Sequence, residues 1–491
     1  MSGDLFDVAA RLPGLRALVI GEAILDSYLR GTSTRLCREA PAPIVDVATR
    51  EDACGGAANT AANVRALGAD VSLLTVLGED ADGARLVGCL GRSGVRLDDA
   101  ITVPGRATLV KQRVVAGTQL LVRFDTGTTE ALPPAVEARV IATLRRRYRE
   151  MDVVIVSDYG YGILTPNVIA ALTELQRSTP RVLFVDSKRL PHYRQVGVTA
   201  VKPNFEEAAA LLGGSARLDS GDRVEAVLSR AARLLTRVGA QYVAVTLDVD
   251  GAVVLDREGG WYRTYATAAP NARAAGAGDT FSAGFALALG AGATMPAAAE
   301  VARAAAQAVV GRDGTTVCTL DDVRAGLLDG GKILDDTRSL TALVNAHRQA
   351  GRRIVFTNGC FDIVHRGHVT YLSQAKALGD VLIVGVNSDE SVRRLKGADR
   401  PVNALEDRAQ VLAGLSSVDH VIAFNEDTPE ALIRLIGPDV VAKGGDYTDE
   451  TLPEAALVRA LGGEVRFLPY LAGASTTGLI AHIRSAPAEA V

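Results

Sequence analysis

The stretch Thr357–His368, T-N-G-C-F-D-I-V-H-R-G-H, combines the end of a strand, a tight turn and two histidines at a helix start. The residues before it form a short β-rich run, Asn358-Gly359 is a turn signal, and a helical pattern begins at Arg366. His365 and His368 therefore share one face of the first turn, where unpaired N–H groups and the helix dipole favour an anion. The sequence predicts a phosphate chain as the ligand of this turn.

The length and composition of the chain limit its class. With 491 residues, 48% of them hydrophobic and 22% charged, it is long enough for at least two domains with substantial cores. Its net charge of −4 argues against a nucleic-acid-binding protein, although a local cluster of cations can still hold a small anion. Five cysteines without paired spacing indicate neither a zinc site nor disulfides, and we expect a cytoplasmic protein.

No membrane segment is expected. The first residues, M-S-G-D-L-F-D, lack the basic and apolar regions of a signal peptide. Thr280–Ala299 has no charge, but alanine and glycine dominate it, and Gly290, Gly292 and Pro296 interrupt it. We therefore predict a buried helix of a globular domain there, and not a membrane span.

Two early segments indicate ligand contact and a hairpin. Gly55-Gly56-Ala57-Ala58-Asn59 precedes a helical pattern; its glycines let a ligand approach the backbone, and Asn59 can bond hydroxyls. Glycines that only pack a helix start are the simpler interpretation of this segment alone. Residues 108–125 alternate polar and apolar side chains around Ala116-Gly117-Thr118, which predicts a β-hairpin and a candidate lid or dimer contact.

Short β-branched runs then alternate with helical patterns. This alternation predicts a mostly parallel sheet covered on both faces, whose ligands bind beyond the carboxyl ends of the strands. Asp158, Asp186 and Asn204 each follow a predicted strand in this way. Later, Gly276-Ala277-Gly278-Asp279-Thr280 opens a long helix, where N–H groups can cradle an anion and Asp279 can accept a proton. For this turn alone, an N-cap aspartate is the simpler interpretation.

Taken together, these segments give residues 1 to about 325 a family resemblance. Gly55–Asn59, Asn204-Phe205-Glu206-Glu207 and Gly276–Asp279 are similar to the G-G-x-x-N, N-x-x-E and G-A-G-D segments of the ribokinase family of sugar kinases. Thr34–Pro41, T-R-L-C-R-E-A-P, resembles the T/S-R-x-x-x-E-A-P segment of bacterial heptose 7-phosphate kinases. The resemblance implies a ribokinase-like domain, with a central sheet and a β lid, that uses ATP to phosphorylate a sugar phosphate.

The same resemblance implies roles for individual residues. Asp279 would be the catalytic base, and the transferring phosphoryl group would be held by Gly276, Ala277 and Gly278. Asn204 and Glu207 would organise Mg²⁺ and its waters. The sugar would contact Asp26, Gly55, Gly56 and Asn59.

This chain departs from the family pattern near two of those segments. Arg273 and Ala275 replace the Asp and Thr of D-x-T-G-A-G-D, and Tyr161 stands where the heptose kinases usually carry lysine. These residues leave a rival hypothesis open, in which the first region has lost kinase activity and only binds a sugar phosphate or dimerises.

A Gly-Gly break with mixed charge follows the first region, and a second α/β pattern comes after it. Val381–Val386 is a predicted strand that ends in N-S-D, and Val440–Ala442 is another that ends in K-G-G-D. Ser475-Thr476-Thr477 precedes a last helix and suits phosphate. We predict domains at residues 1–325 and 341–491, joined by a linker at 326–340.

The second pattern carries its own resemblance. H-x-G-H after a strand, an arginine at 408, K-G-G-D and S-T-T together resemble the cytidylyltransferase-like nucleotidyltransferases over residues 350–485. F-D-I-V-H-R-G-H, N-S-D, L-K-G, R-P-V, E-D-T-P and K-G-G-D-Y are similar to segments of heptose 1-phosphate adenylyltransferases. Two histidines alone would also raise the question of zinc, but no Cys/His cluster supplies a third ligand nearby.

Adenylyl transfer needs donors aimed at the charge that develops on the α-phosphate and the leaving pyrophosphate. By resemblance, His365 and His368 would supply them as catalytic residues. Nucleotide and substrate would be bound by Phe361, Asp362, Lys376, Asp389, Arg408, Lys443, Ser475, Thr476 and Thr477. Asp389 and Asp446 are equally well explained as solvated surface aspartates.

The two resemblances imply a fused, bifunctional α/β enzyme with a Rossmann-like second domain. The first region would phosphorylate O1 of D-glycero-D-manno-heptose 7-phosphate with ATP and Mg²⁺. The second would convert a heptose 1-phosphate and ATP to ADP-heptose and pyrophosphate, with a separate phosphatase acting in between. We expect sugar phosphates and ATP as partners, and a homodimer. Besides the inactive-kinase hypothesis, the same chemistry on another sugar phosphate or with CTP stays open.

Overall fold

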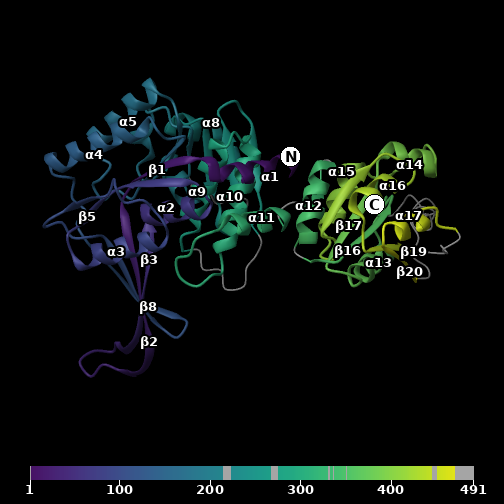
Figure 1. Cartoon of the computed structure of the whole chain (residues 1–491), viewed down its shortest axis with the longest axis horizontal. Coiled ribbons are helices and arrows are strands. Elements are labelled where there is room, and N and C mark those ends of the chain that lie inside the picture. Colours follow the sequence, from purple (N-terminus) through teal and green to yellow (C-terminus); the bar gives the residue numbers. More distant parts are fainter. Residues whose placement is uncertain are drawn as a thin grey trace, which may run out of the picture. The chain divides into compact units, whose positions relative to one another are not determined.

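The chain forms two compact α/β units. The computed structural model describes residues 2–213, 223–266, 275–329, 332–334, 337–349, 351–444 and 451–469. Its first unit is Asp7–Leu327, and its second is Leu328–Val491 together with residues 1–6. Each unit is built on its own central sheet (Figure 1).

The central sheet of the first unit has eight strands in the order β14-β13-β12-β11-β10-β9-β1-β4. Six are parallel and the last two in sequence are antiparallel. The strands are β1 (Arg16–Gly21), β4 (Asp70–Leu74), β9 (Val153–Asp158), β10 (Val182–Ser187), β11 (Ala200–Val201), β12 (Tyr242–Thr246), β13 (Ala252–Asp256) and β14 (Trp261–Thr264). The alternation of β-branched runs with helices predicted the parallel part correctly.

Helices cover both faces of this sheet. Phe184 of β10 packs against Phe285 of α9 (Ala277–Gly290), while its neighbours Leu183 and Val185 face a second core on the opposite side. On the first side α9 also packs against α2 (Ala57–Ala66) and α10 (Met295–Val309). The second core is closed by α4 (Pro134–Tyr148), α5 (Pro166–Ser178) and α8 (Ala231–Val238). The other helices are α1 (Ser2–Arg11), α3 (Ala81–Arg92), α6 (Phe205–Leu211), α7 (Arg223–Leu228) and α11 (Leu320–Asp329).

The uncharged segment Thr280–Ala299 is not one helix. The helix α9 ends at Gly290, and Thr294 caps the start of α10 by accepting a hydrogen bond from the Ala297 N–H. The glycines at 290 and 292 and the proline at 296 explain the break. Throughout the described residues, no helix has both the length and the apolar character that a bilayer crossing requires.

A four-stranded sheet projects from the body of the first unit (Figure 1). Its order is β3-β2-β7-β8, with β2 at Ala23–Leu36, β3 at Pro43–Gly56, β7 at Val110–Ala116 and β8 at Gln119–Thr126. The hairpin β7–β8 confirms the prediction for residues 108–125. A further pair, β5 (Val76–Gly78) and β6 (Ile101–Val103), forms a small separate sheet.

The second unit has a six-stranded parallel sheet in the order β15-β18-β17-β16-β19-β20. Its strands are β15 (Ile333–Leu334), β16 (Ile354–Gly359), β17 (Val381–Asn387), β18 (His420–Phe424), β19 (Val440–Gly444) and β20 (Glu464–Leu468). The helices are α12 (Thr337–Gln349), α13 (Arg366–Lys376), α14 (Asp389–Lys396), α15 (Leu405–Ala413), α16 (Glu430–Ile436) and α17 (Ala455–Ala460). Part of the predicted linker, β15, pairs with β18 and belongs to this sheet.

Candidate active sites

The first unit holds a cavity of about 230 Å³ beyond the carboxyl ends of β9, β10 and β11. The walls bring together four segments that lie far apart in the sequence. The lining residues are Asp158, Tyr159, Asp186, Lys188, Lys202, Asn204, Glu207, Gly276, Gly278 and Asp279. The three polar residues predicted at strand ends therefore meet the Gly276–Asp279 turn in one place, as parallel-sheet topology requires.

Asp279 is the carboxylate at the centre of this site. Asn59 donates to its Oδ2 atom at 2.9 Å, and Tyr159 donates through its hydroxyl to Oδ1 at 3.0 Å. Burial raises the pKa of Asp279 to about 6, helped by the charge of Asp186 and opposed by the Asn59 bond. A carboxylate with this pKa is ionised at neutral pH yet more basic than a solvated one, which suits a general base.

The turn before Asp279 requires glycine. Gly276 caps α9 with a left-handed φ of +84°, and a methyl group there would lie 2.7 Å from Asn59 Nδ2. At Gly278, a methyl group would lie 3.4 Å from the buried ammonium of Lys202, which is paired with Asp186 at 3.0 Å. The start of α9 thus offers free N–H groups beside a cation, an arrangement that can hold a phosphoryl group.

The residues predicted to face a sugar lie next to this centre. Asn59 touches Asp279 directly, and Asp26 of β2 accepts bonds from Arg113 Nη1 at 2.7 Å and from the Thr315 hydroxyl at 3.1 Å. A methyl group at Gly55 would come within 2.6 Å of Asp26 Oδ2. Gly56, with a φ of +58°, caps α2 and so places Asn59 in its first turn.

Asn204 and Glu207 form a reciprocal cap at the start of α6. Asn204 Oδ1 accepts from the Glu207 N–H at 2.8 Å, and Glu207 Oε2 accepts from the Asn204 N–H at 2.9 Å. Both line the cavity, and Asp186 supplies a further carboxylate there. One oxygen of Glu207 is used by the cap and the other has no bond in the described structure. Oxygen atoms on several carboxylates and an amide fit Mg²⁺ held through water.

Several functional residues of this cavity escaped sequence reasoning. Lys202 follows β11 directly, in K-P-N, and that position was the signal available. Tyr159 showed no local signal for its bond to Asp279. Lys188, after Asp186-Ser187, lines the cavity. The cavity therefore has a lysine, although position 161, where the heptose kinases usually carry one, is a tyrosine. Ala275 lies beside Gly276, whereas Arg273 falls outside the described residues.

The second unit places its histidine pair at the start of α13, as the strand-turn-helix pattern predicted. His365 is the N-cap, with Nδ1 accepting from the Gly367 N–H at 3.1 Å, and its ring stacks on that of His368 at a centroid distance of 3.9 Å. His365 Nε2 and His368 Nδ1 are buried without a hydrogen-bond partner in the described structure. Buried polar atoms of this kind normally have partners, so these two nitrogens indicate a missing ligand.

Burial lowers the pKa of His368 to about 4, and the neighbouring His365 adds to this effect. The imidazole is therefore neutral at physiological pH without a ligand, and an arriving phosphate chain would raise its pKa again. Across the described residues, no group of three or more Cys, His, Asp and Glu side chains is placed to hold a metal ion. Phe361 closes one side, with its ring centroid 5.3 Å from that of His368 in an edge-to-face arrangement.

Arg408 and Asp362 hold the loop that carries the histidines. Arg408 is fully buried and donates to Cys360 O at 2.6 Å, to Asp389 Oδ1 at 2.7 Å and to Asn403 O at 3.1 Å. All three guanidinium nitrogens are bonded to protein oxygens, and the contact of Arg408 with the triphosphate stays a prediction. Asp362 accepts from Arg400 and from the Val402 N–H at 2.7 Å, which fixes the next loop.

Of the other residues predicted to bind the nucleotide, some lie near the histidine pair and others do not. Lys443, at the end of β19, donates to Asn358 Oδ1 at 2.6 Å at the end of β16, close to the turn. Lys376 lies in the last turn of α13 and pairs with Asp419 at 2.6 Å, so it is not brought to the histidines. Asp446, Ser475, Thr476 and Thr477 lie outside the described residues.

Comparison with known proteins assigns each unit to a family. The pfkB-family carbohydrate kinase model matches residues 15–322, and the cytidylyltransferase-like model matches residues 356–477. The first unit has the fold of Arabidopsis thaliana ribokinase in complex with ribose and ATP, at 19% identity and a TM-score of 0.51, covering 64% of this chain and 98% of that one. Escherichia coli phosphofructokinase-2 in complex with substrates and products has the same fold, at 21% identity and a TM-score of 0.53. The match covers 64% of this chain and 98% of that one. The ribokinase-like fold is therefore confirmed.

Curated relatives match nearly the whole chain. The bifunctional protein HldE of Pelobacter propionicus is 38% identical over 477 residues, which cover 96% of this chain and 97% of the relative. The HldE of Mesorhizobium japonicum is 38% identical over 483 residues, which cover 97% of this chain and 96% of the relative. This confirms the predicted union of a sugar kinase and a nucleotidyltransferase. The chain therefore belongs to the bifunctional HldE family, in which a pfkB-type carbohydrate kinase is fused to a cytidylyltransferase-like domain.

Proposed function

We propose that the chain catalyses two steps of ADP-heptose synthesis, between which a separate phosphatase removes the 7-phosphate. The kinase transfers a phosphoryl group from ATP to O1 of D-glycero-D-manno-heptose 7-phosphate, and the second domain joins heptose 1-phosphate to the adenylyl group of ATP with release of pyrophosphate. The T-R-L-C-R-E-A-P segment at Thr34–Pro41 and the family membership support the choice of sugar. The observation that carries the proposal is the presence of two separate phosphate-handling centres, at Asp279 and at His365.

In the kinase step, Asp279 Oδ1 or Oδ2 accepts the proton of the O1 hydroxyl as that oxygen attacks the γ-phosphate. Asn59 and Tyr159 hold the carboxylate in place, because each donates to a different oxygen. The N–H groups from Ala277 onward and Lys202 Nζ face the charge of the phosphoryl group. Phosphoryl transfer depends mainly on such positioning and neutralisation.

Mg²⁺ would be held through water by Glu207 and Asn204, with Asp186 nearby. When bound, the ion neutralises charge on the phosphates of ATP. The reciprocal cap of Asn204 and Glu207 holds the Glu207 carboxylate in the wall of the cavity and uses only one of its oxygens. Mg²⁺ titration of a Glu207→Gln variant, followed by ATP binding as well as turnover, tests this assignment.

In the adenylyl step, a phosphate oxygen of the sugar attacks the α-phosphate of ATP. His365 Nε2 and His368 are the proposed donors to the charge that develops there, because both carry buried nitrogens without partners. The neutral imidazole of His368 becomes a better donor as the approaching phosphates raise its pKa. Lys443 is the proposed additional cation, since its ammonium lies at the end of the adjacent strand β19.

We further propose domains at residues 1–325 and 341–491, joined by a segment whose strand β15 pairs into the second sheet, together with a cytoplasmic location and a homodimer. Support for the dimer comes from the β lid, which is the four-stranded sheet β3-β2-β7-β8. Its strand β8 carries Leu120, Val122 and Phe124, whose exposed fractions are 53%, 50% and 43%. An edge strand with exposed apolar side chains pairs readily with another chain. Sedimentation of the wild type and of a Val122→Lys, Phe124→Lys variant tests a second copy as the partner.

The decisive experiment is ³¹P NMR of the protein with Mg-ATP and heptose 7-phosphate, followed by a panel of acceptors and nucleotides in a pyrophosphate-release assay. We expect a 1,7-bisphosphate signal, and pyrophosphate only with heptose 1-phosphate and ATP. A rival function keeps adenylyl transfer but has an inactive kinase, as Ala275 and Tyr161 suggest. Absence of the bisphosphate with active pyrophosphate release would favour that rival.

A further inference from the structure

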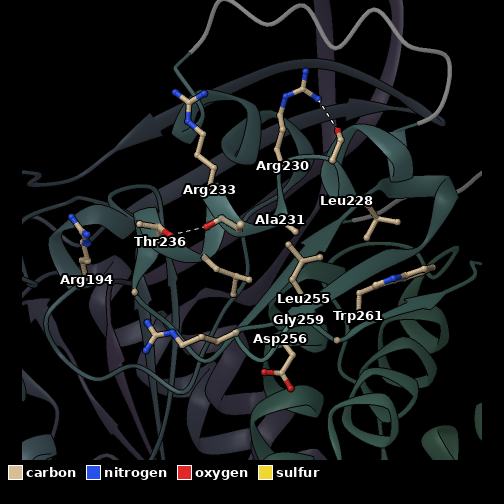
Figure 2. Close-up of a pocket in the computed structure, with 16 residues that line it drawn as sticks. Arg194, Leu228, Arg230, Ala231, Arg233, Thr236, Leu255, Asp256, Gly259 and Trp261 are labelled. Atoms are coloured by element: carbon tan, nitrogen blue, oxygen red, sulfur yellow. Dashed lines mark hydrogen bonds between the residues drawn. The ribbon is translucent and has the colours of Figure 1, made fainter.

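The first unit carries a second, larger cavity that the catalytic residues do not share. Its volume is about 910 Å³, and its walls come from Arg194, from residues 228–236 of the α7–α8 region and from the β13–β14 turn, including Arg257 and Trp261. Figure 2 shows Arg194 and Trp261 toward opposite ends of this cavity, with Arg230 and Arg233 extending along one side. We call it the arginine groove.

The arginine groove and the catalytic cavity lie at opposite ends of the strands of the central sheet. The strand β13 runs antiparallel to β12, so Asp256, which lines the groove, pairs with Tyr242 at the amino end of β12. The catalytic cavity lies beyond the carboxyl ends of the parallel strands, and Thr246 at that end of β12 bridges to Asn204 there. The two linings have no residue in common.

The groove concentrates positive charge that the protein itself does not neutralise. It is lined by four arginines and one carboxylate, Asp256. In the described structure, the guanidinium groups of Arg194, Arg233 and Arg257 have no ion-pair or hydrogen-bond partner, although the whole chain has a net charge of −4. Asp256 Oδ1 accepts from the Glu258 N–H at 3.0 Å. Unpaired guanidinium groups around one hollow fit phosphate oxygens, which accept two N–H bonds from one arginine.

An aromatic surface stands beside these cations. Trp261 is the single tryptophan of the chain, is 55% exposed and begins the edge strand β14. A half-exposed indole offers a flat apolar face, and stacking of a nucleobase on such a face contributes about 1–3 kcal/mol per base. Leu228 and Leu255 extend the apolar floor next to it.

We propose that the arginine groove is a second nucleotide site, which binds a nucleoside di- or triphosphate with its base on Trp261 and its phosphates on Arg194, Arg233 and Arg257. The size of the hollow, the unpaired cations and the aromatic wall together fit a molecule with both an anionic and an aromatic part. Phosphate alone would leave the indole unused, and a nucleoside alone would leave the arginines unused.

Trp261 makes the site directly measurable. Because it is the only tryptophan, its fluorescence in the full-length protein reports on the groove. We expect a saturable change in emission on titration with ADP, and none with adenosine or inorganic phosphate at the same concentrations. In an Arg233→Ala, Arg257→Ala variant the apparent affinity for ADP should fall at least ten-fold, while the initial kinase rate stays at the wild-type value.

The matched control is Arg237→Ala. Arg237 is an exposed arginine of the same helix α8, but it does not line the groove, so this variant should bind ADP as the wild type does. Equal unfolding midpoints of the three proteins show that the variants are folded. No emission change at millimolar ADP, or an unchanged response in the double variant, would overturn the second site.

Discussion

Tyr159 donates its hydroxyl hydrogen bond to Asp279 Oδ1 at 3.0 Å, across 120 residues of chain. The tyrosine is itself held in place, because its backbone N–H donates to Glu22 Oε2 at 2.8 Å and Lys111 Nζ lies 4.8 Å from its ring centroid. Burial is the largest influence on the pKa of Asp279 and raises it, whereas the bond from Tyr159 lowers it. Tyr159 therefore helps to keep the base ionised.

Replacing Tyr159 with phenylalanine should raise the pKa of Asp279. We expect the acidic limb of the kinase pH profile, near pH 6 in the wild type, to move upward by roughly one unit, since a hydrogen bond to a charged group is worth about 1.5–3 kcal/mol. The measurement is the initial rate of ADP formation as a function of pH. Tyr161→Phe is the control and should leave the limb in place. If the acidic limb of the pH profile stays in place in Tyr159→Phe, the hydrogen bond from Tyr159 does not set the pKa of Asp279.

Asp279→Asn should separate catalysis from stability. The folded pKa of about 6 lies above the unfolded value of about 3.9, so the folded state binds this proton more tightly. The stabilisation from Asp279 is therefore complete below about pH 4 and is lost as the pH rises through about 6. Asparagine cannot ionise, so the unfolding midpoint of the variant relative to wild type should rise between about pH 4 and pH 6 and stay level at higher pH.

The same variant should lose about 100- to 10,000-fold in kinase rate and keep pyrophosphate release, because its second domain is unchanged. Unfolding followed by calorimetry and the two activity assays check these outcomes together. Loss of both activities in a folded Asp279→Asn protein would contradict two independent centres.

His365 has two functions that two substitutions can distinguish. Its Nδ1 caps α13 by accepting from the Gly367 N–H, and its Nε2 is the proposed donor to ATP. His365→Asn keeps a capping oxygen, whereas His365→Ala removes the cap, which costs about 1 kcal/mol. Both variants should lose pyrophosphate release and retain kinase activity, but only the alanine variant should unfold at lower temperature. Full adenylyl transfer in His365→Asn would show that the imidazole acts only as a cap.

The sequence predicted those parts of the sites that depend on local order. The turn and helix start around His365 follow from neighbouring residues, because strand, turn and cap signals all lie within Thr357–His368. The same holds for Gly276, whose positive φ only glycine adopts without strain. Topology then explains why Asn204 and Asp279 share one cavity, since both lie at the carboxyl edge of a parallel sheet.

Contacts between distant segments could not be predicted in this way. The bond from Asn59 to Asp279 spans 220 residues, and no local pattern indicated that Tyr159 would reach the same carboxylate. Arg408 was expected at the triphosphate by family resemblance, and the sequence did not indicate that the fold would bury its side chain beneath the loop at Cys360. Burial of this kind depends on the packing of α15 against the sheet, which one sequence does not reveal.

The link between Arg408 and Asp389 gives the last prediction. Arg408 spans the Cys360 carbonyl, the Asn403 carbonyl and the Asp389 carboxylate, so Arg408→Met leaves three partly buried acceptors without their donor. Asp389 is 29% exposed, so water can replace part of the lost bonding, and we expect a loss of about 1–3 kcal/mol in the unfolding of the second domain. Arg408→Lys should restore little of the lost stability, because a single ammonium cannot donate to three separate acceptors as the planar guanidinium does.

The control for Arg408 is Arg394→Met. Arg394 pairs with Asp427 at 2.9 Å on the surface, where its side chain is 45% exposed, so its removal should cost less than about 1 kcal/mol. A double-mutant cycle with Asp389→Ala should show that the costs at 408 and 389 are not additive. Arg408→Met should also lower kcat/KM for pyrophosphate release while the kinase rate stays unchanged, because the displaced loop carries His365. A cost as small as that of Arg394→Met would mean that Arg408 does not organise this loop.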